Sequence, residues 1–170
     1  MKRARAYSPA GISSVFEIKD READGTPISN PLKVGARGGG FVISRGVETE
    51  VSVERDRKDD VTVHINGRPT REARTTETVV RAVLREVGVP TRVSVHHSIE
   101  PPIGCGYGTS AAGSLSSAFA LCKALDLDMT YNQIGQAAHA AEVKCKTGLG
   151  TVGPLMLGGH VVTVQHGAPG

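Results

Sequence analysis

The feature that most constrains the fold is a glycine-rich segment from Pro102 to Ala112, PIGCGYGTSAA, which runs into a stretch of small and apolar residues. Glycines allow a backbone to turn its N–H groups inward and to approach an anion closely. The stretch that follows predicts a helix over residues 110–125. Ser110 lies where this helix begins, and a helix N-terminus adds oriented N–H donors and a partial positive charge. The segment therefore predicts a phosphate-binding loop at the start of a helix.

Residues 101–122 contain no charged residue, which superficially resembles a membrane span. The first half of this segment is rich in Gly, Ser and Pro, so a loop followed by a buried helix is the better interpretation. The net charge of +3 suits anionic ligands, whereas the 4% aromatic content and the absence of Trp disfavour stacking platforms for nucleic acid. We therefore expect no membrane partner and no nucleic-acid partner.

The three cysteines, Cys105, Cys122 and Cys145, are odd in number and never spaced as CxxC. They predict free thiols in a reducing compartment rather than a disulfide or zinc framework. The N-terminal basic residues are not followed by an apolar run, so no secretory signal is expected. These features predict a cytoplasmic protein.

The hydrophobic patterning predicts one α+β domain over the 170 residues, with strands first and helices later. We expect a first strand over residues 3–8 and a long functional loop over 20–39. A meander should follow, with turns near Arg45-Gly46, at 57–60 and at Asn66-Gly67. The further elements expected are a helix over 75–87 with Thr76 as its N-cap, a strand over 91–99, helices over 110–125 and 131–143, and a last strand after Gly158-Gly159.

The glycine loop matches neither of two common nucleotide-binding motifs. The pattern GxxxxGK[ST] requires a Lys after its last glycine, and none is present here. A dinucleotide-binding fold requires GxGxxG, whereas the spacing from Gly104 to Gly108 is GxGxG. The flanking Pro and the Ser-Ala-Ala run point to a different kind of phosphate loop.

The pattern P-x-x-x-G-x-G-x-S-A-A resembles the central motif of the galactokinase, homoserine kinase, mevalonate kinase and phosphomevalonate kinase (GHMP) superfamily. The segments GARGGGF (35–41), AHAAE (138–142) and KTGLG (146–150) resemble its archaeal pantoate kinase branch. With SPAG at 8–11, the likeness spans nearly the whole chain. It implies an N-terminal ATP-binding domain over 1–170 with a ribosomal-protein-like fold, its helices packed on one face of the sheet. It also implies a C-terminal domain that this chain lacks.

The resemblance implies ATP and Mg²⁺ as cofactors and transfer of the ATP γ-phosphate to a small molecule. By motif position, Ser110 and Glu142 would ligate Mg²⁺ and act in catalysis, since this ion prefers hard oxygen ligands and keeps several waters. The residues expected to bind ATP are Pro102, Gly104, Gly106, Tyr107, Gly108, Thr109, Ser110, Ala111 and Ala112.

The resemblance also implies a small-molecule acceptor, pantoate or a similar hydroxy acid, and a role in coenzyme A biosynthesis. His139 precedes Glu142 by three residues and therefore shares its helical face, and the matching histidine of pantoate kinases contacts the substrate. Arg37 could pair with a substrate carboxylate. By contrast, alternation sends His96 and His97 to opposite faces of a strand, so we interpret them as structural.

The sequence departs from the family pattern at three positions. Thr151 stands at the catalytic position where an Asp usually accepts or orients the hydroxyl proton, and Thr cannot act as a base near neutral pH. Ala36 stands where pantoate kinases usually have Ser, and Thr163 where they have Arg. Two alternatives stay open: a nucleotide-binding module with weakened catalysis, or a kinase for shikimate, homoserine or a mevalonate-pathway alcohol. A missing second domain would also uncover an apolar face, which predicts a homo-oligomer.

Overall fold

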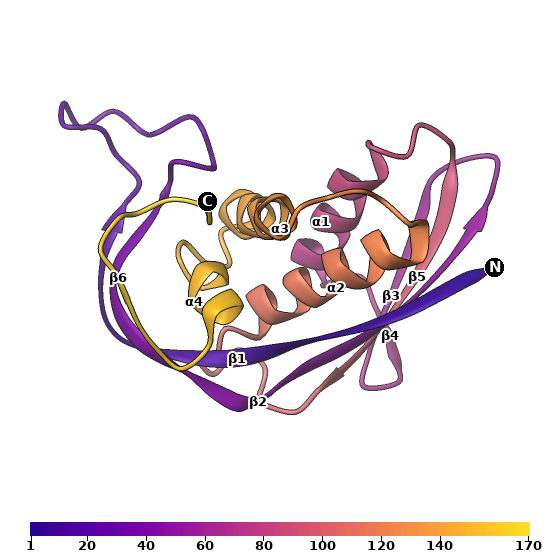
Figure 1. The fold of residues 1–170 in the computed structure, drawn as a ribbon, viewed down its shortest axis with the longest axis horizontal. Coiled ribbons are helices and arrows are strands. Elements are labelled where there is room, and N and C mark those ends of the chain that lie inside the picture. The colour runs from indigo at the N-terminus through magenta and orange to yellow at the C-terminus, as the bar shows by residue number, and fades with distance from the viewer.

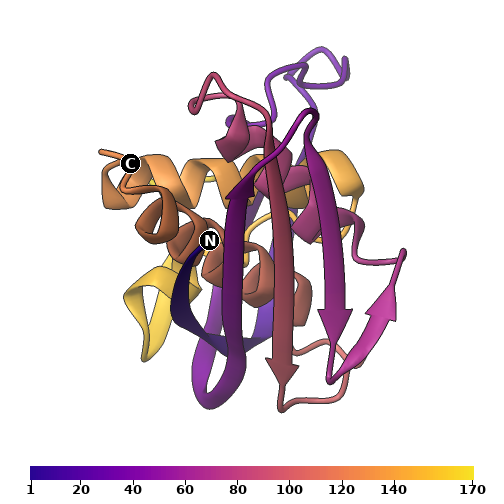
Figure 2. The same cartoon turned by 90° about the vertical axis from the view of Figure 1, so that its right-hand side faces the viewer.

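Six strands form one sheet, and four helices cover the same face of it (Figures 1 and 2). The computed structural model describes residues 1–170. Its strands are β1 (Lys2–Lys19), β2 (Gly35–Arg55), β3 (Asp60–Ile65), β4 (Arg68–Thr70), β5 (Thr91–Ile99) and β6 (His160–Thr163). Its helices are α1 (Arg74–Leu84), α2 (Thr109–Leu125), α3 (Tyr131–Cys145) and α4 (Val152–Leu157). The predicted α+β class, with helices on one face, is confirmed.

The strand order is β1-β2-β5-β3-β4, with β6 paired to the other end of β2. The predicted meander is therefore wrong, because β5 lies between β2 and β3 and runs parallel to β3. The predicted turn at Asn66-Gly67 does connect β3 to β4, and both of its residues have positive φ. Val93 and Val95 of β5 are fully buried, which is why this strand occupies the middle of the sheet.

The first two strands are much longer than predicted. β1 continues to Lys19 rather than ending near residue 8, and β2 already begins at Gly35, within the segment expected to be a loop. β2 also continues through the expected turn at Arg45-Gly46. The glycines here allow β1 and β2 to approach each other closely. A β-carbon at Gly38 would lie only 2.1 Å from the Val15 carbonyl oxygen. The glycine-rich segment that begins at Gly35 therefore forms a tightly packed strand rather than the expected loop.

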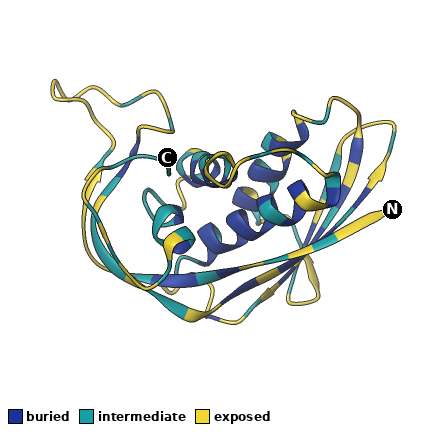
Figure 3. Cartoon of the chain, viewed as in Figure 1, coloured by how far each residue is buried: buried dark blue, intermediate teal, exposed yellow.

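The core lies between the sheet and α2, and Figure 3 shows α2 as the most continuously buried helix. Ala111, Ala118 and Leu121 on α2 are fully buried, and α1 and α3 pack beside it. Small residues allow α2 to approach the sheet on one side and α3 on the other. None of the helices combines the length and the hydropathy that a membrane-crossing helix needs.

The helix starts differ in detail from the prediction. The N-cap of α1 is Ala73, not Thr76, so that prediction is wrong. Thr76 lies in the first turn of the helix, where its hydroxyl bonds Nε2 of His97 at 3.0 Å. The short helix α4 was not predicted, because its six residues are too few to show a helical period.

Candidate active site

The glycine loop between β5 and α2 combines left-handed backbone with open space. Gly104, Gly106 and Gly108 have φ values of 77°, 82° and 63°, a region that favours glycine. A β-carbon at Gly104 or Gly106 would meet nothing within 4 Å. Glycine is therefore required there by the backbone conformation, and the open space beside it leaves room for a ligand.

The first turn of α2 has no side-chain cap. Its N-cap is Gly108, which offers no side-chain oxygen, so the first N–H groups remain available to an anion. The carbonyl of Tyr107 accepts a 3.0 Å hydrogen bond from the N–H of Gly11, which ties the loop to the SPAG segment. Of the residues expected to bind ATP, Pro102, Gly104 and Gly106 are exposed, Tyr107, Gly108 and Ser110 are half-buried, and Thr109, Ala111 and Ala112 are buried.

Glu142, on α3, is a buried carboxylate at only 2% exposure. Burial raises the pKa of Glu142, while hydrogen bonding from the hydroxyls of Ser110 and Thr147 lowers it to a lesser extent. Glu142 forms no ion pair with a basic side chain. The structure thus brings Ser110 and Glu142 together and leaves the carboxylate without a cation.

The loop after α3 shapes the surroundings of Glu142. Thr147 donates a 2.7 Å hydrogen bond to Oε1 of Glu142, and a β-carbon at Gly148 would lie 2.1 Å from Oε2. The donor set of one carboxylate and one hydroxyl fits Mg²⁺, which binds through one or two protein oxygens together with substrate phosphates and waters. No cluster of three or more His, Cys, Asp or Glu side chains is suited to a metal ion, so the phosphates would have to complete the coordination.

Two pockets share Thr147, the residue that bonds this carboxylate. A pocket of about 150 Å³ opens at the starts of α1 and α2 and is lined by Thr109, Ser110 and Thr147. A second pocket of about 750 Å³ is lined by Thr147, Gly148 and Lys146, together with apolar residues of β1 and of the loop before β2. Thr147 therefore borders both pockets and bonds Glu142 as well.

Thr151 lies at the junction of the glycine loop and α4. Its Cγ2 is 2.7 Å from where a β-carbon of Gly108 would stand, and the residue lines the larger pocket. Its hydroxyl makes no capping hydrogen bond to α4. Thr151 therefore lies next to the glycine loop and also lines the larger pocket.

His139 is placed one turn before Glu142 on α3 but is 1% exposed. Its Nε2 bonds the carbonyl oxygen of Val34 at 2.8 Å, and a carbonyl can only accept, so Nε2 carries the proton. Burial lowers the pKa of His139, which keeps the ring neutral. The histidine ties α3 to the segment before β2, and Val34 itself lines the larger pocket.

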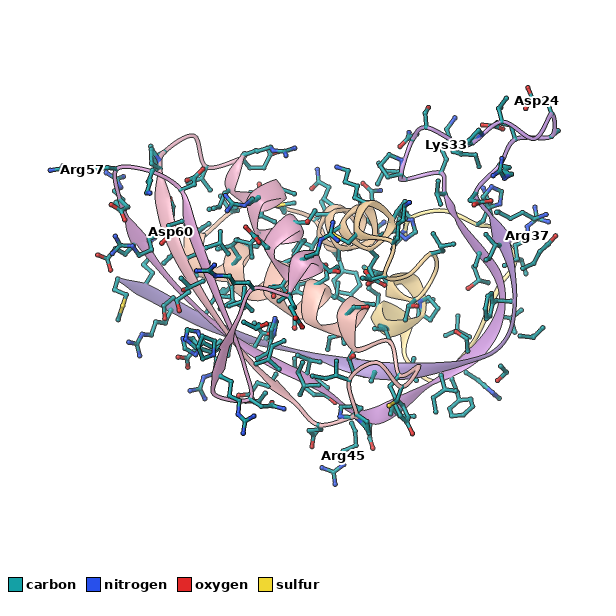
Figure 4. All side chains as sticks on the ribbon, turned by 180° about the vertical axis from the view of Figure 1, so that it is seen from behind. Asp24, Lys33, Arg37, Arg45, Arg57 and Asp60 are labelled. Atoms are coloured by element: carbon teal, nitrogen blue, oxygen red, sulfur yellow. The ribbon has the colours of Figure 1, made fainter.

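Arg37 is not brought to the Glu142 cluster. It is exposed on β2, and Figure 4 shows its side chain projecting outward from the curved strands, away from the helices. Its neighbour across the sheet is Glu17. Its neighbour in sequence, Ala36, faces inward instead and lies 3.2 Å from where a β-carbon of Gly150 would stand.

Sequence reasoning missed Lys146, Thr147 and Thr75 as individual residues. Lys146 ends α3 in the left-handed conformation with φ of 57°, lines the larger pocket and forms no ion pair. The KTGLG segment resembles a family motif, but its spacing alone does not predict that Lys146 lines a pocket or that Thr147 bonds Glu142. Thr75 carried no sequence signal at all.

Comparison with known proteins agrees with this geometry. Residues 74–159 match the family described as the GHMP kinases N terminal domain. The pantoate kinase of Thermococcus kodakarensis is 34% identical over 171 residues, covering 98% of this chain and 53% of that protein.

Solved structures show the same relationship. A structure described as a phosphotransferase related to the CoA biosynthesis pathway superposes with a TM-score of 0.86 at 34% identity, covering 99% of this chain and 55% of the other. The homoserine kinase of Cytophaga hutchinsonii, at 19% identity and a TM-score of 0.68, shares the fold over 95% of this chain and 48% of its own. The chain thus spans about half the length of the proteins it matches. Family match, sequence identity and fold agree that the chain belongs to the GHMP kinase family.

Proposed function

We propose that this protein is the ATP-binding half of an ATP-dependent kinase that phosphorylates the hydroxyl of pantoate to 4-phosphopantoate, in the cytoplasmic synthesis of coenzyme A. The observation that carries the proposal is that two pockets share Thr147, which bonds the buried Glu142 carboxylate, with Ser110 and the uncapped start of α2 lining one of them. The name of the relative from T. kodakarensis supports pantoate as the acceptor.

In this proposal the residues position the reactants rather than react themselves. The N–H groups at the start of α2 would bind the ATP phosphates, and Ser110 with Glu142 would hold Mg²⁺. When bound, this ion neutralises charge on the phosphates. The acceptor hydroxyl oxygen forms a bond to the γ-phosphorus as the bond to the ADP oxygen breaks, and the hydroxyl proton leaves to solvent or to the phosphate. Thr151 can orient that hydroxyl but cannot take its proton.

The larger pocket supports an acidic, partly apolar acceptor. Phe16, Ile18 and Ile28 line one part of it, which suits the branched carbon skeleton of pantoate. Lys146 lines another part without a carboxylate partner, so it is available to the carboxylate of a hydroxy acid. Arg37 is exposed and lines a neighbouring pocket with Ala36 and Thr151, which also border the larger pocket, but it does not itself line the larger one.

One assay tests the proposal. The protein is incubated with ATP, Mg²⁺ and pantoate, shikimate, homoserine or mevalonate in turn, ADP release is followed, and the product is identified by mass. Pantoate should gain one phosphoryl group, and the Ser110→Ala and Glu142→Gln variants should not release ADP above background. Phosphorylation of another acceptor in preference to pantoate would contradict the choice of substrate.

A nucleotide-binding module without turnover is the second candidate function. Thr151, beside Gly108, is the observation that favours it, since no ionisable base stands at that position. Mg-ATP would then raise the melting temperature, as any native-state ligand does, with no product from any of the four acceptors. Measured turnover would exclude this candidate.

A further inference from the structure

Two threonine hydroxyls connect helix α1 to the Glu142 carboxylate. Thr75, in the first turn of α1, lies 2.9 Å from the hydroxyl of Thr147, and Thr147 lies 2.7 Å from Oε1 of Glu142. Thr75 is 5% exposed, so its hydroxyl has little competition from water. The chain of hydrogen bonds spans three segments that are distant in sequence.

The direction of these hydrogen bonds follows from chemistry. An ionised carboxylate can only accept, so Thr147 gives its proton to Glu142. The hydroxyl of Thr147 then has only lone pairs left, so Thr75 must donate to it. The direction of each bond is thereby defined, and the chain links α1 to one oxygen of the carboxylate, while Ser110 of α2 also bonds Glu142.

The backbone of the loop is held by separate contacts. The N–H groups of Lys146 and Thr147 cap the end of α3, the latter with a 3.1 Å bond to the carbonyl of Glu142. These bonds do not involve the Thr147 hydroxyl. Loss of that hydroxyl would therefore remove the bond to Oε1 of Glu142, leaving the bond from Ser110 and these backbone bonds in place.

The two oxygens of Glu142 have different surroundings. Oε1 is held by Thr147, whereas Oε2 lies against Gly148, where a β-carbon would be only 2.1 Å away. We propose that Thr147, with Thr75 behind it, is the positioning residue that aims the Glu142 carboxylate at the magnesium ion of the bound nucleotide. This inference rests on the proposed function, because it requires Glu142 to be a magnesium ligand.

The test measures how nucleotide binding depends on Mg²⁺. ATP binding to the whole chain is titrated at increasing Mg²⁺ and in EDTA, for wild type, Thr147→Val, Thr147→Ser, Thr75→Val and the Thr75→Val/Thr147→Val double variant. Thr147→Val should raise the Mg²⁺ concentration for half-maximal binding about tenfold or more, the usual effect of losing a residue that orients a metal ligand. Binding in EDTA should not change, and Thr147→Ser should behave as wild type.

Two features of the design separate positioning from general packing. Thr78→Val is the matched control, because Thr78 also joins α1 to α3, through a 3.2 Å contact with Sγ of Cys145, without touching Glu142. It should leave the Mg²⁺ dependence unchanged. The effect of Thr75→Val should disappear in the double variant, since Thr75 acts only through Thr147.

The outcomes distinguish this inference from the proposed function. Wild-type Mg²⁺ dependence in folded Thr147→Val would overturn the inference alone. Absence of Mg²⁺-dependent binding in wild type, or its persistence unchanged in Glu142→Gln, would overturn the proposed magnesium site and this inference together. Thermal melting establishes that each variant folds; if Thr147→Val does not, an unchanged Mg²⁺ dependence in Thr75→Val overturns the inference.

Discussion

A β-carbon at position 148 would lie 2.1 Å from Oε2 of Glu142, so Gly148 and the carboxylate occupy one site that admits no larger side chain. The atom in this contact is the far end of the Glu142 side chain, so the side chain rather than the backbone would have to shift. Any residue other than glycine at 148 must displace the carboxylate. The loop sequence after α3 thus fixes where a cation could bind.

The Gly148→Ala variant should fold and lose most of its Mg-ATP binding. The added methyl group pushes the carboxylate away from its position, and misplaced metal ligands typically cost about tenfold or more in affinity. Isothermal titration calorimetry with Mg-ATP measures the effect. Gly153→Ala is the matched control, since a β-carbon there would have its nearest neighbour at 4.0 Å. Equal loss in both variants would contradict the prediction.

The Glu142→Gln variant should be more stable than wild type at neutral pH without ligand. The pKa of Glu142 is raised in the folded state by burial, so the cost of burying its charge appears as pH rises above about 4.5 and through the folded pKa. Urea unfolding between pH 4 and 8 should therefore show a stability gap that opens with rising pH.

The same variant should no longer be stabilised by Mg-ATP. A ligand at a hundredfold excess over its Kd stabilises a native protein by about 2.7 kcal/mol, and this gain should be nearly absent in Glu142→Gln. A Glu142→Gln protein that is less stable than wild type at pH 8, yet still stabilised by Mg-ATP, would show that the carboxylate has a purely structural role.

The folded protein should lose stability as pH falls below about 6.5, because of His97. Burial lowers the pKa of His97 to about 4, and its ring bonds Thr49 and Thr76. Between these two pH values the unfolded chain binds a proton that the folded chain does not. The contribution is about 3 kcal/mol in full and is lost as pH falls toward 4. His97→Gln should flatten the pH dependence of urea unfolding, whereas His96→Gln should change it much less, because the charge of His96 is only the smaller cause of the lowered His97 pKa.

The Ser117→Ala variant should stabilise the protein by about 1 kcal/mol. Its hydroxyl is buried in α2 without a hydrogen-bond partner, and removing an unsatisfied buried polar group relieves its desolvation cost. The neighbouring Ser116 is the comparison, because its hydroxyl lies 2.6 Å from Thr49 and 2.8 Å from the Ala112 carbonyl. Ser116→Ala should destabilise by a similar amount. Thermal melts of the two variants should shift in opposite directions.

Lys146→Met should weaken acceptor binding, and Arg37→Met should not. A charge-assisted contact with a substrate carboxylate is worth about 1.5–3 kcal/mol, so KM for pantoate should rise about tenfold or more when Lys146 is replaced. KM for ATP should stay unchanged in both variants. If Arg37→Met raised KM for pantoate more than Lys146→Met did, Arg37 rather than Lys146 would be the residue that binds the substrate carboxylate.

Much of the secondary structure could be predicted from the sequence, because its signals are local. The strand over 91–99 and the helix starting near Ser110 follow from alternation and from a glycine boundary, and both are confirmed. The structure of the glycine-rich segment around Gly38 could not be predicted in the same way. A run of glycines is found both in loops and where two strands approach closely, and the local pattern does not distinguish these.

The sequence by itself determined the glycine loop at the start of a helix, the α+β class and the placement of Ser110 and Glu142 on separate helices. Only the tertiary structure decided which strands are neighbours, that Arg37 points outward, and that Thr75 reaches Thr147 across 72 residues of sequence. The physical reason is that propensity and periodicity act over a few residues. The orientation of the Glu142 carboxylate, in contrast, depends on how α1, α2 and α3 pack together on one sheet.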